Sequence, residues 1–373
     1  MMTEAQKARY ARHLLLPGFG EDAQLKLLRS KVLLIGAGGL GSPSALYLAA
    51  AGVGHLTIID HDTVDESNLQ RQILHRSQDV GQPKVESARR ELLALNPELQ
   101  ITLHQVPFTQ DNALSLVEEH DLVIDGSDNF TTRFLSNDAC FFARVPLVYG
   151  SIFQFEGQLT MFDYRDESPC YRCLVPAVPD DGAVPNCLEA GVIGTLPGII
   201  GSMQAMEAIK YLAGVGTPPV GKMLYYSALD TSFREISIQK DPACPLCSDS
   251  PKITSLKEEK TESCALDTAP SITCDELISL MQTEDIFLLD VREPAEFAQH
   301  RLPGSQLLPL STLKNQIPEL PRDRPIYVHC KAGLRSLKAI NLLKEQGYSR
   351  LINISDGIDG LSSEINRANM SDE

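Results

Sequence analysis

A lone cysteine near the end of the chain stands where a predicted strand gives way to a predicted helix. Cys330 closes the strand-like run "RPIYVHC", and the loop "KAGLR" leads into the amphipathic pattern "SLKAINLLKEQG". Loop amides and a helix N-terminus stabilise a thiolate, the nucleophilic form of cysteine. The pattern predicts a reactive Cys330 in an anion-binding loop that ends at Arg335, and the alternative is a small buried residue at a strand end.

Four further cysteines form two C-x-x-C pairs that lie far apart in the sequence. The run "CYRC" holds Cys170 and Cys173, and the run "CPLC" holds Cys244 and Cys247. Two such pairs in one domain are typical of a closed tetrahedral Zn²⁺ site made of thiolates, which is structural because no coordination position stays open. A redox C-x-x-C needs only one pair, so we favour Zn²⁺ over a redox site or plain buried thiols.

A glycine-rich loop lies near the N-terminus. The stretch "KVLLIGAGGLGSPSALYLAAAGVGHLTIIDHD" predicts a strand, a glycine loop, a helix and a second strand. Glycines in G-x-G-x-x-G spacing permit a tight turn and let backbone amides approach a phosphate, and an acid about 20 residues later can bind a ribose hydroxyl. The predicted nucleotide-binding residues are Gly36, Gly38, Gly39, Gly41 and Asp60. The loop alone does not separate NAD from ATP, and a purely structural turn is the other alternative.

Charged residues after this loop favour a polyphosphate ligand. Asn68, Arg71 and Lys84 follow in "DESNLQRQILH" and "GQPKVESARR", so two fixed cations could converge on phosphates. The run "DLVIDGSDNFTTR" ends a strand with Asp125 and Asp128, carboxylates that could hold Mg²⁺ against those phosphates. Each charge alone would be a solvated surface residue, but together they indicate a site. A dehydrogenase needs no such clamp, and no general acid or base for one stands out.

The elements that must position these residues follow from alternating apolar runs and helical patterns. The runs before residue 248 are "KVLLIGA", "HLTIID", "DLVIDG" and "VPLVYG", and the later ones are "IFLLDV" and "PIYVHC". Both parts therefore predict α/β folds with largely parallel sheets. The polar segment "SDSPKITSLKEEKTESCALDTAP" has no apolar periodicity, as expected of a linker. We predict a nucleotide-binding domain over residues 1–248, a linker over 249–269 and a smaller α/β domain over 270–373.

The composition argues against several classes of protein. The 373 residues carry a formal net charge of −16 and no Lys/Arg-rich run, so nucleic acid is not an expected partner. The start "MMTEAQKARYARHLLL" lacks the pattern of a secretory signal. The most apolar stretch, "GVIGTLPGIIGSMQAMEAIKYLAG", is broken by Gln204, Glu207 and Lys210 and predicts a packed core helix. We expect a cytoplasmic protein without a membrane span, whose nine cysteines are metal ligands or reactive thiols.

The first two thirds of the chain resemble the ThiF/MoeB family of ubiquitin-activating-type adenylyltransferases. The matching motifs run in family order from residue 9 to residue 210: "RYARH", "GAGGLGS", "IIDHDTVDESNLQRQ", "GQPKVESA", "GSDN", "CYRC" and "GSMQAMEAIK". The resemblance implies a Rossmann-like domain with a structural zinc site. It also implies that the domain uses ATP to adenylate the C-terminal Gly-Gly carboxylate of a ubiquitin-like sulfur-carrier protein.

The same resemblance implies roles for individual residues. It gives ribose binding to Asp60, Mg²⁺ binding to Asp128, and phosphate binding to Asn68, Arg71 and Lys84. Arg12 of "RYAR" would reach the phosphates in the partner subunit, which implies a homodimer with a composite site. Cys187, in "DDGAVPNCLEAGVIG", would lie on a loop that crosses the adenylate site. In some family members the cysteine at this place bonds covalently to the carrier or to the sulfur donor. The alternative is a loop thiol with no function.

The last third of the chain resembles the rhodanese family of sulfurtransferases. The run "LLDVREPAEFAQHRLPGSQLLPL" carries the family pattern, with Arg301 where many members have histidine. Phosphatases of this fold have five residues between cysteine and arginine, whereas four separate Cys330 from Arg335, and the smaller ring suits a terminal persulfide sulfur. The resemblance implies a Cys330 persulfide, charged by a persulfide or thiosulfate donor and stabilised by Arg335 and the loop amides.

The two resemblances together predict one route. The adenylated carrier would take sulfur from Cys330 and leave as a thiocarboxylate once a thiol, for which Cys187 is one candidate, cleaves the acyl-disulfide. Molybdopterin, thiamine, thiolated-tRNA and cysteine pathways use similar enzymes, so the carrier stays open. The alternatives are an NAD-dependent oxidoreductase, which leaves Arg71, Lys84 and the cysteine motifs unexplained, and a non-catalytic binder of ubiquitin-like proteins.

Overall fold

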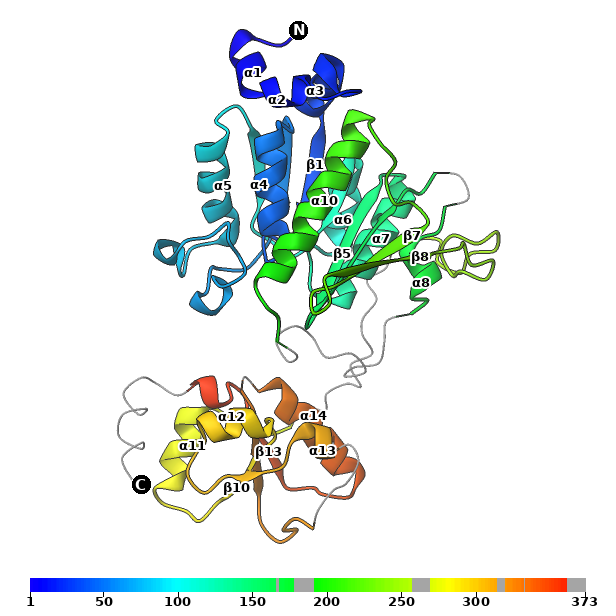
Figure 1. The fold of residues 1–373 in the computed structure, drawn as a ribbon. Coiled ribbons are helices and arrows are strands. Elements are labelled where there is room, and N and C mark those ends of the chain that lie inside the picture. The colour runs from blue at the N-terminus through cyan, green and yellow to red at the C-terminus, as the bar shows by residue number, and fades with distance from the viewer. Residues whose placement is uncertain (166–167, 178–190, 257–268, 314–318, 332, 361–373) are drawn as a thin grey trace. The chain divides into compact units, whose positions relative to one another are not determined.

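The chain forms two compact units, Met1–Thr261 and Glu262–Glu373, and both are α/β as expected (Figure 1). The computed structural model describes residues 1–165, 168–177, 191–256, 269–313, 319–331 and 333–360. Much of the expected linker falls outside these ranges, so the domain limits inferred from the sequence stay a prediction. Each unit is described by itself below.

The first unit is built on an eight-stranded sheet in the order β3-β2-β1-β4-β5-β6-β7-β8. The strands β3, β2, β1, β4 and β5 pair in parallel, whereas β6, β7 and β8 are antiparallel. The chain leaves β1 to one side for β2 and later returns to its other side for β4, which makes a topological switch point. The strands are β1 (Lys31–Ile35), β2 (His55–Ile59), β3 (Gln100–His104), β4 (Leu122–Asp125), β5 (Leu147–Phe153), β6 (Glu156–Phe162), β7 (Lys222–Ser227) and β8 (Ser232–Ser237).

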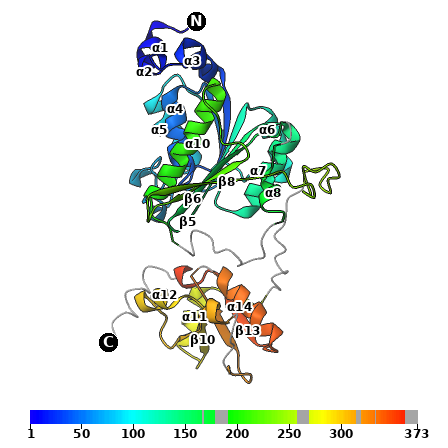
Figure 2. The same ribbon diagram turned by 45° about the vertical axis from the view of Figure 1, so that its right-hand side comes forward.

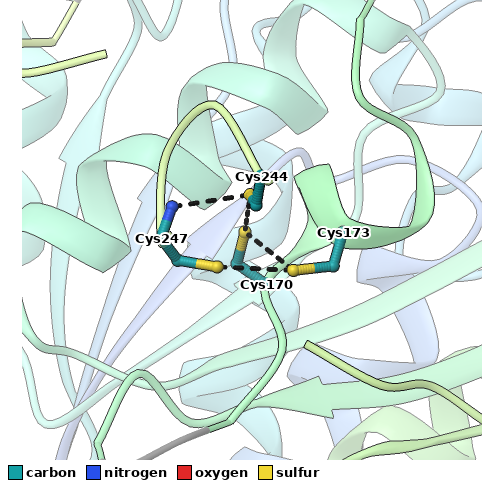
Figure 3. A group of neighbouring side chains, drawn as sticks. All are labelled: Cys170, Cys173, Cys244 and Cys247. Atoms are coloured by element: carbon teal, nitrogen blue, oxygen red, sulfur yellow. Dashed lines mark hydrogen bonds between the residues drawn. The ribbon is translucent and has the colours of Figure 1, made fainter. Parts of the chain in front are cut away.

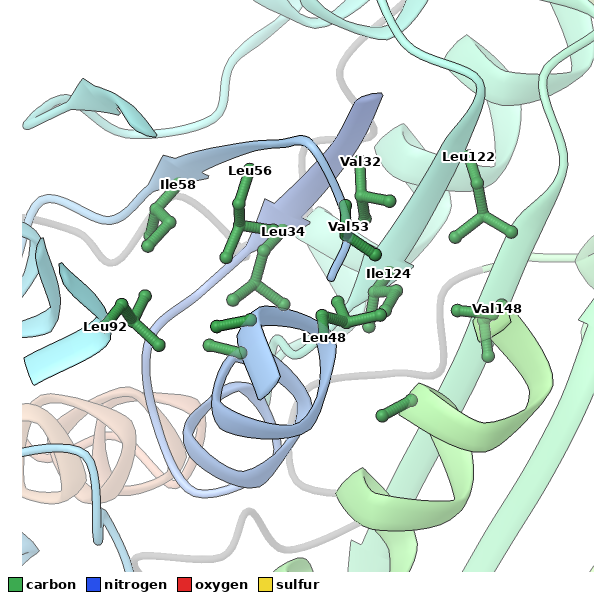
Figure 4. Close-up of a cluster of buried hydrophobic side chains, with 14 of the residues drawn as sticks. Val32, Leu34, Leu48, Val53, Leu56, Ile58, Leu92, Leu122, Ile124 and Val148 are labelled. Atoms are coloured by element: carbon green, nitrogen blue, oxygen red, sulfur yellow. The ribbon is translucent and has the colours of Figure 1, made fainter. Parts of the chain in front are cut away.

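Helices cover both faces of this sheet (Figure 2). Side chains alternate along β1, so Val32 and Leu34 enter one core cluster while Leu33 and Ile35 enter another. The first cluster packs α4 (Gly41–Ala51), α5 (Lys84–Leu95) and α10 (Thr195–Ala213) on the sheet, and Figure 4 shows Leu48 of α4 facing it. The second packs α6 (Gln110–Glu118), α7 (Phe130–Ala143) and α8 (Tyr171–Leu174). Burial contributes about 1.5–3 kcal/mol for each large aliphatic side chain.

Helix α10 is the core helix that the apolar stretch predicts. It packs against α4 and β5, and Nε2 of the buried Gln204 donates a hydrogen bond to the backbone oxygen of Asp125 at 2.7 Å. Among the described residues no helix is long and apolar enough to cross a membrane.

Three N-terminal helices lie at the end of the sheet where the strands β1 and β2 begin. They are α1 (Glu4–Arg9), α2 (Ala11–Leu14) and α3 (Gly20–Arg29). The carbonyl of Leu27 in α3 accepts a hydrogen bond from Gly54, just before β2. The glycine loop follows β1 at the other end of that strand, so the length of the strand separates these helices from the loop.

The second unit is built on an all-parallel five-stranded sheet in the order β11-β10-β12-β13-β9. Its strands are β9 (Ser271–Ile272), β10 (Phe287–Asp290), β11 (Gln306–Leu307), β12 (Ile326–His329) and β13 (Leu351–Ile354). The helices are α11 (Cys274–Met281), α12 (Pro294–Gln299), α13 (Leu310–Leu313) and α14 (Leu334–Glu345). Asp290 pairs with His329, so β10 and β12 end side by side.

Candidate functional site

A pocket opens at the switch point of the first unit, where the carboxyl ends of β1, β2 and β4 meet. This is the place where open α/β sheets bind ligands. Of the residues predicted to bind the nucleotide, Gly41 and Asn68 are not among those that line the pocket. The lining includes Gly36, Gly38, Gly39, Leu40, Asp60, Asp62, Arg71, Gln72, Lys84, Asp128, Asn129 and Arg133. The pocket therefore gathers residues that span almost a hundred positions of sequence.

The glycine loop crosses from β1 to α4 in a tight turn that has no room for a side chain at Gly41. Gly36 has φ 87°, and a Cβ atom on Gly41 would lie 2.0 Å from the carbonyl oxygen of Gly36. A Cβ on Gly38 would meet nothing closer than the Gln72 amide nitrogen at 3.7 Å, which leaves space for a ligand. Within the described residues the amides of Gly38, Gly39 and Leu40 have no protein acceptor, so they are available to an anion.

Asp60 follows β2 and is locked against the glycine loop. Its Oδ2 accepts a hydrogen bond from the Ala37 amide at 2.8 Å, and its Oδ1 accepts one from the Asp62 amide at 2.8 Å. The residue is only 9% exposed. Two backbone donors thus fix the carboxylate at the wall of the pocket, where the lone pairs that remain can accept from a ligand hydroxyl.

Both expected cations reach the pocket, and each is held by a neighbour. Nζ of the buried Lys84 lies 2.7 Å from Oδ2 of Asp62. Arg71 donates to Oδ1 of Asn68 at 2.9 Å and to the Ser67 carbonyl at 3.3 Å. Asn68, in the 3₁₀ helix η1 (Glu66–Asn68), is not among the lining residues, so its amide orients Arg71 rather than facing the pocket itself.

The two carboxylates expected to share Mg²⁺ have different surroundings. Asp128 is exposed and lines the pocket. Asp125 is fully buried, and its oxygens accept hydrogen bonds from the Ser127 amide at 2.9 Å and the Ser136 hydroxyl at 2.7 Å. The expectation that Asp125 holds Mg²⁺ is therefore wrong, because its carboxylate fastens the β4–α7 connection from inside.

Sequence reasoning missed two parts of the pocket. Arg133 lines it, with its guanidinium 5.8 Å from the ring centroid of Tyr149. Val106, Pro107 and Phe108 form an apolar wall, which suits a flat ring such as a purine. The available signals were the arginine in "SDNFTTR" and the apolar run after β3, but neither is distinctive without the fold.

Arg12 lies far from the pocket of its own chain. It is an exposed residue of α2, at the edge of the sheet where β1 begins, and it is not among the lining residues. Cys187, the other residue expected near the adenylate, lies outside the described residues. The structure thus brings together the glycine loop, Asp60, Arg71, Lys84 and Asp128, but not Arg12.

The four cysteines of the two C-x-x-C pairs meet in one cluster (Figure 3). The Sγ atom of Cys170 lies 4.0 Å from that of Cys173 and 3.6 Å from that of Cys244, and the Sγ atoms of Cys173 and Cys247 are 3.3 Å apart. All four lie within 4.8 Å of one another. A tetrahedral Zn²⁺ with bonds of about 2.3 Å requires sulfur atoms about 3.8 Å apart. The donor set and its spacing fit Zn²⁺.

The surroundings of the cluster favour the thiolate at two of its sulfurs. Backbone amides of Asp241 and Cys247 donate to Sγ of Cys173 and of Cys244, each at 3.4 Å. Hydrogen bonds with the neighbouring cysteines lower the pKa of Cys173 and of Cys244 and raise the pKa of Cys170 and of Cys247. Cys173 and Cys244 are thus the sulfurs most favoured as thiolates, the form that a metal binds.

A buried ion pair ties the first cysteine pair to α7. Arg172 lies between Cys170 and Cys173, and its Nε and Nη2 donate to the two carboxylate oxygens of Asp138 at 2.8 and 2.6 Å. Both side chains are at most 2% exposed. The Tyr171 amide donates to Asn137 of the same helix at 2.8 Å. Helix α7 begins directly after Asp128 and Asn129, so one helix links the cysteine cluster to the nucleotide pocket.

In the second unit Cys330 directly follows β12 and is 1% exposed. The hydroxyl of Ser336 in α14 lies 3.5 Å from its Sγ. Gly333, at the start of α14, has φ 84°, and a Cβ there would lie 2.0 Å from the Ser355 carbonyl oxygen. Ala332 lies outside the described residues. The expected order of strand, short loop and helix around a buried thiol is present.

Arg335 is held by a carboxylate of the neighbouring helix α12. Its two terminal nitrogens each lie 2.7 Å from an oxygen of Glu296, a bidentate pair. This hydrogen bonding is the main reason that the pKa of Glu296 falls to about 2. The Arg335 guanidinium is thus paired with the carboxylate of Glu296, which lies 39 positions earlier in the sequence.

The fold and these sites define a class: an enzyme with a nucleotide-binding α/β domain for adenylyl transfer and a second domain for sulfur transfer. The sequence matches the ThiF family over residues 10–246 and the rhodanese-like domain over residues 273–364. The chain belongs to the ThiF family and carries a rhodanese-like domain after it.

Several relatives match most of the chain or about two thirds of it. The probable adenylyltransferase/sulfurtransferase MoeZ of Mycobacterium tuberculosis is 41% identical, and the match covers 96% of this chain and 93% of MoeZ. The sulfur carrier protein adenylyltransferase of Thermus thermophilus is 46% identical over 67% of this chain and 93% of its own length. Drosophila virilis MOCS3, an adenylyltransferase and sulfurtransferase, is 42% identical over 90% of this chain and 79% of its own.

A solved structure supports the fold of the first unit. The crystal structure of E. coli MccB superposes with a TM-score of 0.59 at 22% identity, and the match covers 66% of this chain and 73% of MccB. This likeness concerns the fold alone.

The Arg335–Glu296 pair predicts a specific acid titration. A carboxyl pKa lowered to about 2 means that the pair stabilises the folded state above the ordinary pKa of 4.5 and that this contribution disappears as the pH falls toward 2. We expect the Glu296 carboxyl, followed by ¹³C NMR, to be ionised at about pH 3.5 in the wild type and mostly protonated there in Arg335→Met. Arg301→Met is the control; an unchanged titration in Arg335→Met would contradict the pairing.

Proposed function

We propose that the first unit adenylates the C-terminal Gly-Gly carboxylate of a ubiquitin-like sulfur-carrier protein and that the second unit delivers sulfur to it from a Cys330 persulfide. The observation that carries this proposal is the switch-point pocket, in which a glycine loop, two cations and the exposed Asp128 meet in a chain that also holds a rhodanese loop. The names of the MoeZ and MOCS3 relatives support the same pair of activities, and the name of the Thermus relative supports adenylation of a sulfur carrier.

Different residues of the pocket are placed to bind different parts of ATP. Asp60, fixed by two backbone amides, is placed to accept from ribose hydroxyls, and the wall at Phe108 suits the adenine ring. The amides of the glycine loop, Arg71 and Lys84 provide positive charge for the phosphates. Asn68 contributes by orienting Arg71. Asp128 would hold Mg²⁺, which neutralises charge on the phosphates when bound.

The adenylation step needs positioning and charge more than proton transfer. The carrier carboxylate is already ionised, so its oxygen attacks the α-phosphorus without a general base, and the bond from that phosphorus to the bridging oxygen breaks. Pyrophosphate leaves with the electron pair, and the carrier becomes an acyl-adenylate. Negative charge grows on the leaving group, where Arg71 and Lys84 stabilise it.

The sulfur step uses the thiol of the second unit. The Cys330 thiolate attacks the outer sulfur of a persulfide or thiosulfate donor, the S–S bond of the donor breaks, and a thiolate or sulfite leaves, which gives Cys330–S–S⁻. The terminal sulfur attacks the acyl carbon of the adenylate, AMP leaves, and an acyl-disulfide forms. A second thiolate then attacks the Cys330 sulfur, which releases the carrier thiocarboxylate and leaves a disulfide that a further thiol reduces. Cys187 is a candidate for that second thiol.

We also propose a homodimer in which Arg12 completes the pocket of the partner subunit. Arg12 lies at the end of the sheet that is away from the pocket of its own chain. This location supports the proposal, because there Arg12 can reach a nucleotide only in the pocket of a second subunit. A cytoplasmic setting, which suits the free thiols, completes the proposal.

We propose Zn²⁺ as the occupant of the cysteine cluster, with a structural role. Freshly purified protein should contain about one Zn²⁺ per chain, because four thiolates within 4.8 Å would repel without it. Cys247→Ser should lower the zinc content and the melting temperature, whereas Cys274→Ser should keep the zinc. Elemental analysis and thermal unfolding measure both quantities. Zinc-free protein with four reactive thiols would rule out the assignment.

The Mg²⁺ role of Asp128 leads to a test of adenylation. Asp128→Ala should lower carrier-dependent ATP–pyrophosphate exchange at least a hundredfold, because the charge at the phosphates is no longer neutralised. The control Asp275→Ala changes an exposed aspartate of the second unit and should exchange like the wild type. Full exchange by folded Asp128→Ala would contradict the assignment.

The sulfur route predicts a separation of the two activities. Cys330→Ala should retain exchange but form no carrier thiocarboxylate from ATP and thiosulfate, because the nucleophile that carries sulfur is absent. Mass spectrometry of carriers ending in Gly-Gly measures the product, and Cys274→Ala is the matched control. Undiminished thiocarboxylate with Cys330→Ala would refute the route.

A further inference from the structure

His75 is a buried histidine that lies behind the glycine loop. It closes the run "NLQRQILH", lies between η1 and the 3₁₀ helix η2 (Ser77–Asp79), and is 4% exposed. It is not among the residues that line the nucleotide pocket. Its neighbour on the pocket side is Ala37, which precedes the lining residue Gly38.

Both backbone polar groups of Ala37 are held by side chains. The amide donates to Asp60 at 2.8 Å, and the carbonyl oxygen lies 2.9 Å from Nε2 of His75. Most backbone groups of a loop bond to other backbone groups or to water. Here two side chains that follow β2 fix the backbone at a single residue of the glycine loop.

A chain of hydrogen bonds fixes the histidine ring in turn. Nδ1 of His75 lies 2.9 Å from the Ser87 hydroxyl, which donates to Oδ2 of Asp79 at 2.6 Å. Asp79 is fully buried, accepts from the Arg76 amide at 3.1 Å and forms an ion pair with Arg90. The ring therefore has one orientation, set by α5 and η2 together.

The proton on Nε2 follows from the chemistry of its partner. A carbonyl oxygen can only accept, so Nε2 must carry hydrogen. The Ser87 hydroxyl has one hydrogen, so while it donates to Asp79 it accepts from a protonated Nδ1, and it must turn away from Asp79 to donate to a bare Nδ1. Nε2 keeps its hydrogen in both arrangements. Burial lowers the pKa of His75, which the charge of Lys84 reinforces and those of Asp60 and Asp79 oppose. The neutral and charged rings both keep the bond to Ala37.

The bond to Ala37 controls the direction of the next amide. The Ala37 carbonyl and the Gly38 N–H belong to one trans peptide unit, in which they point in opposite directions. With the carbonyl held on His75, behind the loop, the Gly38 N–H points to the other side, where Gly38 lines the pocket. A glycine that follows the peptide unit would otherwise let it rotate at little cost and turn a carbonyl oxygen toward the phosphates.

We propose that His75 is a positioning residue of the adenylation site: through Nε2 it holds the Ala37–Gly38 peptide so that the Gly38 amide faces the ATP phosphates. The role rests on the proposed function of the pocket. It is distinct from the cations Arg71 and Lys84, because His75 touches the loop and not the ligand.

Two isosteric variants separate this role from general packing. The amide nitrogen of glutamine ends as many bonds from Cα as Nε2 of histidine, so His75→Gln can still donate to Ala37. The amide nitrogen of asparagine matches Nδ1, so His75→Asn can reach Ser87 but not Ala37. Calorimetric titration of the full-length protein with Mg·ATP, without carrier, should give a Kd within about twofold of wild type for His75→Gln and about tenfold weaker for His75→Asn.

A variant of Ser87 and an NMR measurement of Nε2 test the same role of His75 independently. Ser87→Ala removes the anchor of the ring but not its bond to Ala37, so its Kd should lie between those of the two His75 variants. If His75→Asn unfolds, the Ser87→Ala value and the ¹⁵N signal of Nε2, protonated across the pH titration, take its place. Equal Kd values for folded Gln and Asn variants, or an unprotonated Nε2, would overturn the inference while the proposed function stands. Wild-type protein that does not bind ATP would overturn both.

Discussion

The first unit depends on a turn that has no room for a side chain at Gly41. A Cβ on residue 41 would lie 2.0 Å from the carbonyl oxygen of Gly36, so β1 can lead directly into α4 only with glycine there. Because the turn is so short, the N-terminus of α4 faces the switch point, and its free amides gather where a phosphate can reach them. Asp60 and His75 then fix Ala37 from either side of its backbone. A nucleotide site follows from this one close approach.

The opposite wall of the pocket depends on a second region of fixed geometry. Asp125 ends β4 inside the protein and accepts from Ser136 of α7, so the segment between them places Asp128 at the pocket. Farther along the same helix Asp138 pairs with Arg172, inside the cysteine cluster. Loss of one partner of a buried pair costs about 3–5 kcal/mol, because the other charge stays without compensation. The cysteine cluster and the nucleotide pocket are thus both fastened to α7, the cluster through Asp138 in the middle of the helix and the pocket through the segment that leads into its N-terminus.

The sequence predicted those features that local chemistry determines and missed those that the fold determines. Glycine spacing and paired cysteines have few physical explanations, so the nucleotide loop and the cluster were found from spacing alone. Asp125 and Asp128 are alike in sequence, but Asp125 ends a buried strand and is held there by the Ser127 amide and by Ser136, eleven residues later. The orientation of Arg71 by Asn68, the apolar wall at Phe108 and the hold of Glu296 on Arg335 are likewise tertiary contacts between residues with no shared motif. The antiparallel pairs β5–β6 and β7–β8 depart from the largely parallel pattern because short connections join the two strands of each pair.

The charges of the second unit agree with the proposed preference of its loop for sulfur over phosphate. Arg335 is paired with Glu296 through two bonds of 2.7 Å, so the carboxylate offsets its positive charge, and the N-terminus of the twelve-residue helix α14, four residues after Cys330, adds only partial positive charge. The nearby Asp290 and Arg292 also cancel, since they pair side by side under full burial. A phosphate dianion needs more compensation than such partial charges supply, whereas a persulfide carries a single diffuse charge on a polarisable atom. With Cys330 only 1% exposed, the short loop and the neutralised arginine select the same ligand, one by size and the other by charge.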